Sequence, residues 1–294
     1  MLITVFTPTY NRVHTINRTF ESLCNQSTRN FEWLIIDDGS TDNTEEKVKE
    51  FITLADFPIK YIKKENGGKH TAYNMAVKEA NGKLFFTVDS DDWLPDDSLN
   101  FIESNVDILF KNENLAGIIA LKAFSDNNII GVSYPENRFI CSLEDLEKNH
   151  LNGERTIILK TDIAKAFPFP IILGEKYMGE SVIYNEIGKR YKFEIFNKIL
   201  TVCEYQQDGL TQNIAKLLVK NPIGYMLYES QRIDLSVGLR KRILSCLRYH
   251  GFRRLSNREV SNEYKYLGNH NALVLLTSPL GRIIAKYYIL KSKK

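Results

Sequence analysis

The sequence predicts an α/β protein whose mostly parallel central sheet is flanked by helices and followed by a helical, basic C-terminal extension. Before residue 90, short apolar runs alternate with polar turns and helical stretches, which is typical of βαβ units. The charge is uneven: the net charge is +3, but residues 232–294 hold 14 Lys or Arg against three acids, whereas residues 1–231 carry −8. The 294 residues exceed a common single domain, so we expect a core domain plus an extension.

Four short apolar segments in the first part of the chain are typical of buried strands, at residues 2–7, 31–37, 59–64 and 84–88. Helices follow the first three and begin near His14, Asn43 and Gly68, with Thr41 and Asp42 as candidate N-caps of the second. Parallel sheets bind ligands beyond the carboxyl ends of their strands. We therefore expect one site built from the four loops that follow these strands, at residues 8–12, 37–42, 65–70 and 89–95.

The pattern changes after residue 95. Further strands are predicted at residues 115–124, 129–133, 156–160 and 198–205, with a helix at residues 179–189. From residue 211 onward the pattern is helical, with breaks at Asn221-Pro222, Gly238, Gly251 and Ser278-Pro279.

The clearest chemical signal is an apolar strand that runs directly into Asp89, Ser90, Asp91 and Asp92. Crowded carboxylates raise one another's pKa unless a cation lies between them. Their hard oxygen ligands suit Mg²⁺ or Mn²⁺, which can also bridge the phosphates of a nucleotide. A solvated acidic turn is the alternative. An EF-hand calcium loop is excluded, because Trp93 and Leu94 occupy positions that need a ligand and a glycine.

A second strand ends in Asp37 and Asp38, followed by a glycine turn. A carboxylate there can accept hydrogen bonds from a uracil N3–H or from ribose hydroxyls, whereas it would repel phosphate. These residues are therefore candidates for reading a base or a sugar. An Asx turn with a helix cap explains the pattern equally well.

Gly67, Gly68 and Lys69 open the third helix. Backbone N–H groups at a helix N-terminus favour anions, and Lys69 adds a full charge, so a diphosphate is a natural ligand. His70 could also contact donor phosphate. A plain tight turn is the alternative.

The loop after the first strand holds Pro8, Thr9, Tyr10 and Arg12. The tyrosine could stack on a base and the polar groups could hold it. Alone this signal is weak, since exposed loop tyrosines often pack on their own neighbours.

Together, TPTYNR, IIDDGSTDNT, ENGGKHTAYNMA and VDSDDWLPDDSL stand in the order and at the spacing of the family 2 glycosyltransferases. The chain resembles that family densely over residues 1–100 and more thinly to residue 215. The resemblance implies the GT-A (Rossmann-like) fold, a nucleotide-diphosphate sugar donor, usually a UDP-sugar, and inversion at the anomeric carbon by direct displacement.

The resemblance also implies roles for individual residues. Pro8, Thr9 and Tyr10 would line the nucleobase, Asp38 would accept from uracil and Lys69 would approach the diphosphate. Asp89 and Asp91 match the DxD pair, with Asp91 favoured for direct metal ligation and Asp89 for ribose or a metal-bound water; Asp92 could share either role.

An inverting transferase needs a general base to take the proton of the attacking hydroxyl. The family usually supplies it from a Glu-Asp pair at the start of a helix, and the matching pair here is Glu180 and Ser181. Serine cannot act as a base at neutral pH, so Glu180 is the first candidate and Glu175 the second. A charge in the first helical turn is the structural alternative for Glu180.

Three segments follow from these predictions. Residues 1–215 form the GT-A domain, with a nucleotide-binding half at 1–95 and an acceptor half at 96–215, and residues 216–294 form the basic extension. The segment at residues 203–211 resembles the loop that follows the core in relatives and can fold over the donor; a simple connection is the alternative.

The extension should not span a bilayer, because no stretch of 18 residues or more is free of charges and helix breakers. It either binds an anionic membrane surface, which suits an undecaprenyl-linked acceptor, or caps the core with solvated charges. Nucleic acid is not expected as a partner, because no nucleic-acid motif accompanies the basic residues.

The N-terminus lacks a basic region followed by a long apolar stretch, so we expect no secretory signal and a cytoplasmic protein, at most peripheral on the inner face of the membrane. The widely spaced cysteines have no expected chemical role: Cys24, Cys141, Cys203 and Cys246. Two rival functions remain open. A sugar nucleotidyltransferase would need a glycine-rich N-terminal phosphate loop, which residues 8–12 do not supply; a non-catalytic binding protein would fit the departure at Ser181.

Overall fold

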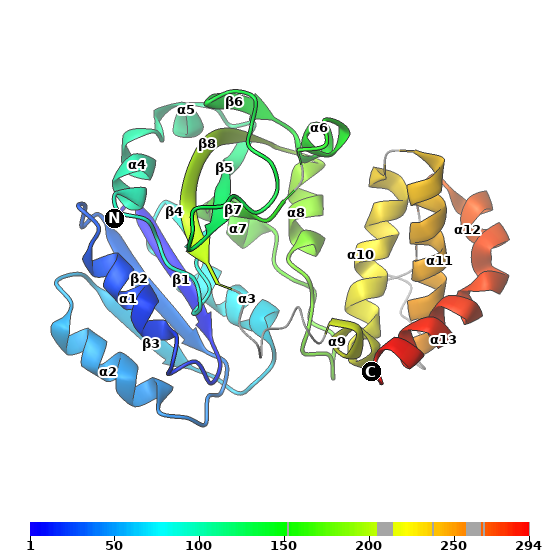
Figure 1. Ribbon diagram of the computed structural model, residues 1–294, viewed down its shortest axis with the longest axis horizontal. Coiled ribbons are helices and arrows are strands. Elements are labelled where there is room, and N and C mark those ends of the chain that lie inside the picture. Colours follow the sequence, from blue (N-terminus) through cyan, green and yellow to red (C-terminus); the bar gives the residue numbers. More distant parts are fainter. Residues whose placement is uncertain (152, 205–213, 237, 257–265, 267, 294) are drawn as a thin grey trace. The chain divides into compact units, whose positions relative to one another are not determined.

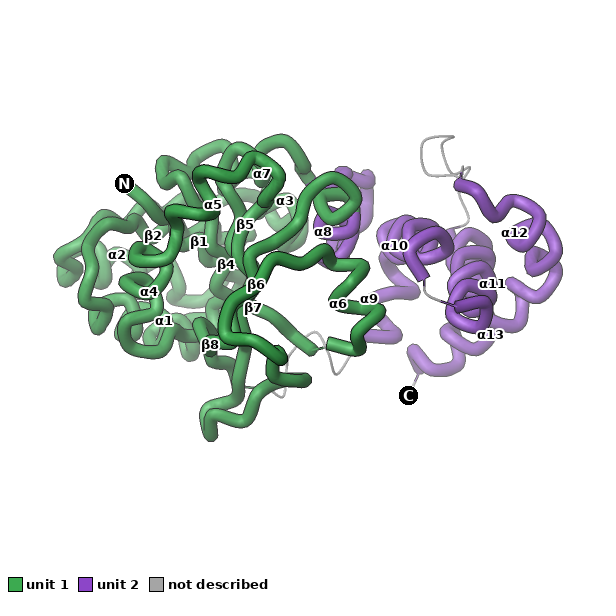
Figure 2. Tube along the Cα trace, turned by 90° about the horizontal axis from the view of Figure 1, so that it is seen from above, with its two compact units in different colours: residues 1–168, 186–205 green, residues 169–185, 206–294 purple. Residues whose placement is uncertain are grey.

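The computed structural model describes residues 1–151, 153–204, 214–236, 238–256, 266 and 268–293. The chain forms two compact units, Met1–Pro168 with Glu186–Tyr205 and Phe169–Asn185 with Gln206–Lys294 (Figure 2). Residues 169–185 thus pack with the C-terminal helices, whereas the sequence assigns them to the acceptor half.

The first unit is built on one sheet with the strand order β3-β2-β1-β4-β7-β5-β8-β6 (Figure 1). Strands β3, β2, β1 and β4 are parallel, as the βαβ pattern predicts, and β7 runs antiparallel to both β4 and β5. Strand β8 is parallel to β5, and β6 is antiparallel to β8. The bounds are β1 (Ile3–Thr9), β2 (Phe31–Asp37), β3 (Ile59–Lys63), β4 (Leu84–Thr87), β5 (Leu115–Phe124), β6 (Arg138–Cys141), β7 (Arg155–Lys160) and β8 (Lys192–Cys203).

Helices cover both faces of the parallel half, which explains why β1, β2 and β4 are largely apolar and buried, whereas the edge strand β3 alternates lysines with apolar residues. On one face, Phe20 of α1 stacks on Phe51 of α2 with ring centroids 4.1 Å apart, and both pack on Trp33 of β2. On the other, Tyr73 of α3 packs edge-on against Phe85 of β4. The helices of this unit are α1 (Ile16–Cys24), α2 (Thr44–Leu54), α3 (Lys69–Glu79), α4 (Ser98–Ser104), α5 (Asp107–Lys111), α6 (Leu143–Lys148) and α7 (Thr161–Ala166).

The strand predicted at residues 129–133 is wrong. After the turn at Asn127, which has a left-handed φ of 65°, the chain folds straight back and Ile130 N–H donates to the Lys122 carbonyl at the end of β5. Only isolated bridges form, at Ile129 and at Gly131, whose φ of +114° ends the extended run.

Two further boundaries differ from the prediction. Strand β8 begins at Lys192 rather than near residue 198, and Oε1 of its buried Glu194 accepts from Arg138 of β6 at 2.7 Å. The N-cap of α2 is Asn43, and the Asp42 carboxylate instead accepts from the N–H of Thr44.

The second unit is helical. It contains α9 (Ile214–Lys220), α10 (Pro222–Leu235), α11 (Leu239–Leu255), α12 (Asn271–Thr277), the 3₁₀ turn η2 (Ser278–Leu280) and α13 (Gly281–Lys291), while α8 (Ser181–Gly188) crosses from one unit to the other. Tyr225, Phe252 and Tyr288 join α10, α11 and α13 edge to face.

The helix break predicted at Gly251 is wrong, because α11 runs through it. A Cβ there would lie 2.6 Å from Ile284 Cγ2, so the glycine permits the close approach of α13 rather than ending a helix.

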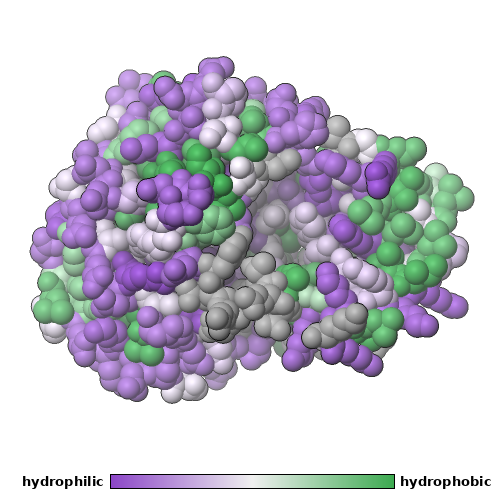
Figure 3. Space-filling view, in the orientation of Figure 1, coloured by the Kyte–Doolittle hydropathy of each residue, from purple (hydrophilic) through white to green (hydrophobic). Residues whose placement is uncertain are grey.

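Residues Asn271–Lys291 form a helical run long and apolar enough to cross a membrane, with a mean hydropathy of 1.3. The sequence predicts the opposite from Pro279 and the charges, but Pro279 is accommodated in the 3₁₀ turn. Length and composition alone are weak grounds for a span, since core helices can meet the same criterion. This run, however, is only 17% buried, and Figure 3 shows apolar residues gathered over the C-terminal helices.

Candidate functional site

The carboxyl ends of the parallel strands meet at one edge of the sheet. In the register, Thr9 lies beside Asp37, and Phe6 lies beside Thr87 just before the acidic residues. The loops predicted to share a site therefore follow neighbouring strands.

Asp89, Asp91 and Asp92, which we call the acid cluster, follow β4 and are partly neutralised by two lysines. Lys69 Nζ lies 2.5 Å from Asp89 Oδ1, and Lys122 Nζ lies 2.7 Å from Asp92 Oδ2. The two lysines lower the pKa of Asp89 against the opposing effect of burial. The sequence analysis missed Lys122, although a single lysine inside the apolar run of β5 was a signal for a buried anion.

The remaining carboxylates of the acid cluster keep raised pKa values. Burial, and then the charge of Asp89, raise the pKa of Asp91, while Arg12 and Lys69 oppose the shift. Burial raises the pKa of Asp92 to about 7 despite its pairing with Lys122. The site is thus short of positive charge at Asp91, where a divalent cation would be favoured.

The loop that carries the acid cluster is fixed by its neighbours. Thr19 of α1 donates to the Asp92 carbonyl at 2.7 Å, and Trp93 pairs with Val202 of β8 through two backbone hydrogen bonds of 2.9 and 2.8 Å. Arg18 lies over the Trp93 ring at 4.8 Å. The carboxylates are therefore held in place before any ligand binds, as a binding site requires.

Asp38 and the glycine turn are used differently from what the sequence predicts. Gly67 N–H donates to Asp38 Oδ1 at 2.9 Å, Gly68 N–H donates to Oδ2 at 2.7 Å, and Lys64 Nζ lies 2.5 Å from Oδ1. The N–H groups of Gly67 and Gly68 are thus not available to cradle a phosphate, and Asp38 is not a free acceptor for uracil. The Asp38 side chain is only 7% exposed, so backbone N–H groups of the next loop, rather than water, satisfy its carboxylate.

Asp37 is also internally satisfied. One oxygen accepts from Ser40 N–H at 2.7 Å and the other from the Tyr61 hydroxyl at 2.6 Å, and the residue is fully buried. Asp37 therefore has a structural part in shaping the loop, through a bond to the backbone three residues on rather than the two of an Asx turn.

The first loop keeps groups that a nucleobase could use. Pro8 and Thr9 end β1 rather than standing in the loop, and Tyr10 is 48% exposed. Thr9 Oγ1 is buried and has no hydrogen-bond partner among the described residues, which fits a missing polar ligand. Asn11 adopts φ 52° and links this loop to Ser40, whose Oγ accepts from Asn11 N–H at 2.9 Å.

The acid cluster fits a metal that is shared with a ligand. Among the described residues, no group of three or more His, Cys, Asp or Glu side chains could hold a metal by itself. Mg²⁺-type sites commonly use one or two carboxylates completed by substrate phosphates. Asp91 and Asp89 offer that set of ligands, with Ser90 buried between them.

The two candidate bases belong to the second unit and have different surroundings. Glu175 is buried, and its carboxylate accepts from the N–H groups of Ile223 at 2.7 Å and Gly224 at 2.8 Å in the first turn of α10. It therefore braces that helix, which disfavours it as a base. Glu180 stands half-buried just before α8, whose first residue, Ser181, is exposed. Of the predicted donor-covering loop at residues 203–211, only Cys203 and Glu204 are among the described residues.

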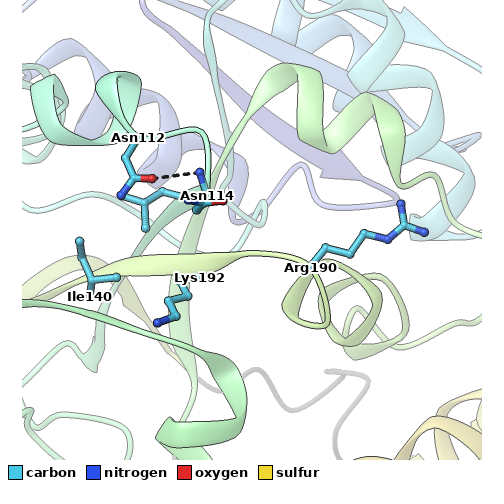
Figure 4. A pocket seen from close by; sticks show the side chains of 6 residues that line it. Asn112, Asn114, Ile140, Arg190 and Lys192 are labelled. Carbon is cyan, nitrogen blue, oxygen red and sulfur yellow. Dashed lines mark hydrogen bonds between the residues drawn. The ribbon is translucent and has the colours of Figure 1, made fainter.

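A separate cavity of about 340 Å³ lies at the opposite edge of the sheet, where β5 and β8 begin (Figure 4). Its lining consists of Asn112, Asn114, Leu115, Ile140, Arg190 and Lys192. Because β5 runs parallel to β4, this cavity is at the amino edge and we assign it no part in donor binding.

Comparison with known proteins shows the family to which the chain belongs. Residues 4–120 match the family model described as Glycosyl transferase family 2. The chain is 32% identical over 178 residues to the UDP-Glc:alpha-D-GlcNAc-diphosphoundecaprenol beta-1,3-glucosyltransferase WfgD of Escherichia coli. The aligned segment covers 60% of this chain and 67% of that protein. It is 34% identical over 134 residues to glycosyltransferase GlyA of Streptococcus pneumoniae, covering 45% of this chain but only 18% of that protein.

Solved structures show the same fold at low identity. S. aureus TarS 1–349 in complex with UDP-GlcNAc gives a TM-score of 0.62 at 17% identity, covering 97% of this chain and 92% of that one. The mannosyltransferase PcManGT from Pyrobaculum calidifontis, in complex with GDP-Man and Mn²⁺, gives 0.55 at 16% identity, covering 99% and 83%. The resemblance seen in the four sequence motifs is thus confirmed, and the chain belongs to the family 2 glycosyltransferases, an enzyme with the GT-A fold.

Proposed function

We propose that this chain is an inverting, metal-dependent glycosyltransferase that transfers a sugar from a UDP-sugar to a saccharide, most directly a lipid-linked one, in surface polysaccharide synthesis. The observation that carries the proposal is the acid cluster, which is rigidly held at the carboxyl edge and short of positive charge at Asp91. The name of the E. coli relative supports a UDP-sugar donor and an undecaprenyl-linked acceptor.

The residues divide into donor-side and acceptor-side groups. Asp91, with Asp89, would hold Mn²⁺ or Mg²⁺, and the metal when bound would neutralise charge on the leaving diphosphate. Lys69 would contact the diphosphate, and Tyr10 with Thr9 would receive the nucleobase. Asp38 would act as a brace that sets the backbone at Gly67 and Gly68.

Glu180 is the proposed general base. Direct displacement at the anomeric carbon requires the acceptor hydroxyl to lose its proton as the new bond forms, and a carboxylate can accept it. The position of Glu180 at the start of α8 is the one that the family resemblance implies, and Glu175 is engaged elsewhere.

A thermal-shift panel of UDP-, GDP- and TDP-sugars, each with and without Mn²⁺, tests the donor assignment. We expect UDP-sugars to raise the melting temperature most, and only with Mn²⁺, because the metal joins the acid cluster to the diphosphate. No shift with any nucleotide sugar, or an equal shift with EDTA, would count against the assignment.

The second part of the proposal is that the C-terminal helices bind an anionic membrane surface on the cytoplasmic side. Five exposed apolar residues, which we call the apolar stripe, recur at spacings of four and three: Leu276, Leu280, Ile283, Tyr287 and Leu290. Ile283, Tyr287 and Leu290 therefore lie on one face of α13, and Leu276 of α12 and Leu280 of the 3₁₀ turn continue the series towards the N-terminus. Arg282 and Lys286 are exposed beside that face, so apolar burial and attraction to anionic lipid would act together.

Replacing Leu276, Ile283 and Tyr287 by Gln is expected to reduce binding to phosphatidylglycerol-containing liposomes by at least about tenfold, because each residue loses its favourable burial. Co-sedimentation measures this. Gln at Ile52 and Leu54, which are exposed on α2, provides the matched control and should leave binding unchanged.

Equal sedimentation of all three proteins would contradict a membrane role for the stripe. Extraction of native membranes with alkaline carbonate separates the remaining possibilities. We expect release, since the stripe and its charges suit interfacial binding; retention would indicate a span.

A further inference from the structure

Two lysines partly neutralise the acid cluster, but they differ in how easily each ammonium can leave its carboxylate partner. Lys122 and Asp92 are 15% and 7% exposed, whereas Lys69 and Asp89 are 33% and 35% exposed. A buried pair is costly to break because it leaves an uncompensated charge. Asp89 Oδ1 is itself buried, but the Lys69 side chain is more exposed than that of Lys122, so its ammonium can turn toward a ligand that enters from solvent. Lys69 is therefore the cation of the site that can move.

We propose that Lys69 is the counter-ion of Asp89 before the donor binds, and that its ammonium moves to the diphosphate when the donor arrives. The inference rests on the proposed function, since it takes the donor to be a nucleoside diphosphate bound with a divalent cation. Lys69 is the first residue of α3, directly after the turn at Gly68, and its flexible four-carbon stem allows the ammonium to change partners.

This arrangement makes the lysine a competitor of the metal. An ammonium that pairs with Asp89 repels a divalent cation that uses the same carboxylate, so metal alone binds weakly. The diphosphate brings negative charge that draws Lys69 away and supplies further oxygen ligands. Metal and nucleotide therefore bind cooperatively, and each raises the affinity for the other by the same factor.

Loss of the charge at Lys69 should therefore have opposite effects on the two ligands. We expect Lys69→Met to raise the affinity for Mn²⁺ alone by about tenfold and to lower the affinity for UDP at saturating Mn²⁺ by about tenfold. Titration calorimetry on the full chain measures both constants without any turnover. Lys69→Gln should show the same pair of changes, and Lys69→Arg, which keeps the charge, should bind Mn²⁺ alone as weakly as the unaltered chain.

Lys60→Met is the matched control. Lys60 lies 2.6 Å from Glu79 at the other end of α3, and the two side chains are 45% and 40% exposed. The change removes the same charge from a comparable pair, and we expect both affinities to stay within about twofold because solvent screens charges at that distance. Circular dichroism checks that each variant is folded.

The outcomes separate this inference from the function beneath it. If Lys69→Met and Lys69→Gln lose UDP affinity but bind Mn²⁺ no better, Lys69 is only a diphosphate ligand and the counter-ion role is overturned while the donor site stands. If the unaltered chain shows no Mn²⁺-dependent UDP binding at all, the proposed function fails first.

Discussion

Asp91→Asn is expected to lower the rate of sugar transfer by at least about a thousandfold, because the carboxylate that holds the metal is lost while the shape of the side chain is kept. The measurement is UDP release in the presence of Mn²⁺ and acceptor. Asp96→Asn removes a charge from an exposed position in the same loop and should retain full activity. Activity of Asp91→Asn within about tenfold of the unaltered enzyme would contradict its proposed role as metal ligand.

The same variant should be at least as stable as the unaltered chain. Because the pKa of Asp91 is raised in the folded state, the folded protein binds this proton more tightly than the unfolded chain does, and the stability from this group falls as pH rises above the unfolded pKa. Asparagine carries no charge and so avoids the cost of burying an ionised carboxylate. The melting temperature of Asp91→Asn should therefore exceed that of the unaltered chain at pH 8, and this difference should be smaller at pH 4. A lower melting temperature at pH 8 would show that Asp91 is needed for folding, which would undermine the activity test.

Glu180→Gln is expected to reduce transfer by about a hundred- to ten-thousandfold, since a general base contributes on that order and an amide cannot accept the proton. Donor binding by calorimetry should stay unchanged, because the base acts on the acceptor. Transfer and binding together therefore distinguish a base from a donor ligand.

Glu175→Gln serves as the comparison. One of the two backbone donors of α10 would then face an amide NH₂, and we expect a loss of about 1–3 kcal/mol in folding stability with transfer per folded molecule retained. The reverse pattern, in which Glu175→Gln abolishes transfer and Glu180→Gln does not, would reassign the base.

Three strands of the parallel half were predictable because burial on both faces leaves largely apolar runs at 2–7, 31–37 and 84–88, which became β1, β2 and β4. The run at 59–64, where lysines alternate with apolar residues, became the edge strand β3, and all four agree with the prediction to within two residues at each end. A buried charge inside a later strand was harder to interpret. The first half of β8 was missed because Glu194 looks like a surface residue until Arg138 of β6 is known to lie beside it.

The acid cluster could be predicted from consecutive residues of the sequence, but the partners of the site residues could not. Asp38 is separated by about 30 positions from the glycines that it binds, and Lys122 by 30 from Asp92, so only the fold brings each pair together. Motif reasoning assigned Gly67 and Gly68 to a phosphate because it could not see that a carboxylate already accepts from their N–H groups. The chemistry of a loop depends on what its neighbours leave unsatisfied.

The most direct test of metal-dependent transfer is the rate of UDP release from a panel of UDP-sugars with lipid-linked saccharide acceptors, first with Mn²⁺ and then with excess EDTA. We expect release that requires the acceptor, falls by at least about a hundredfold in EDTA and returns when Mn²⁺ is restored. Undiminished acceptor-dependent release in excess EDTA would contradict the role assigned to the acid cluster at Asp89, Asp91 and Asp92.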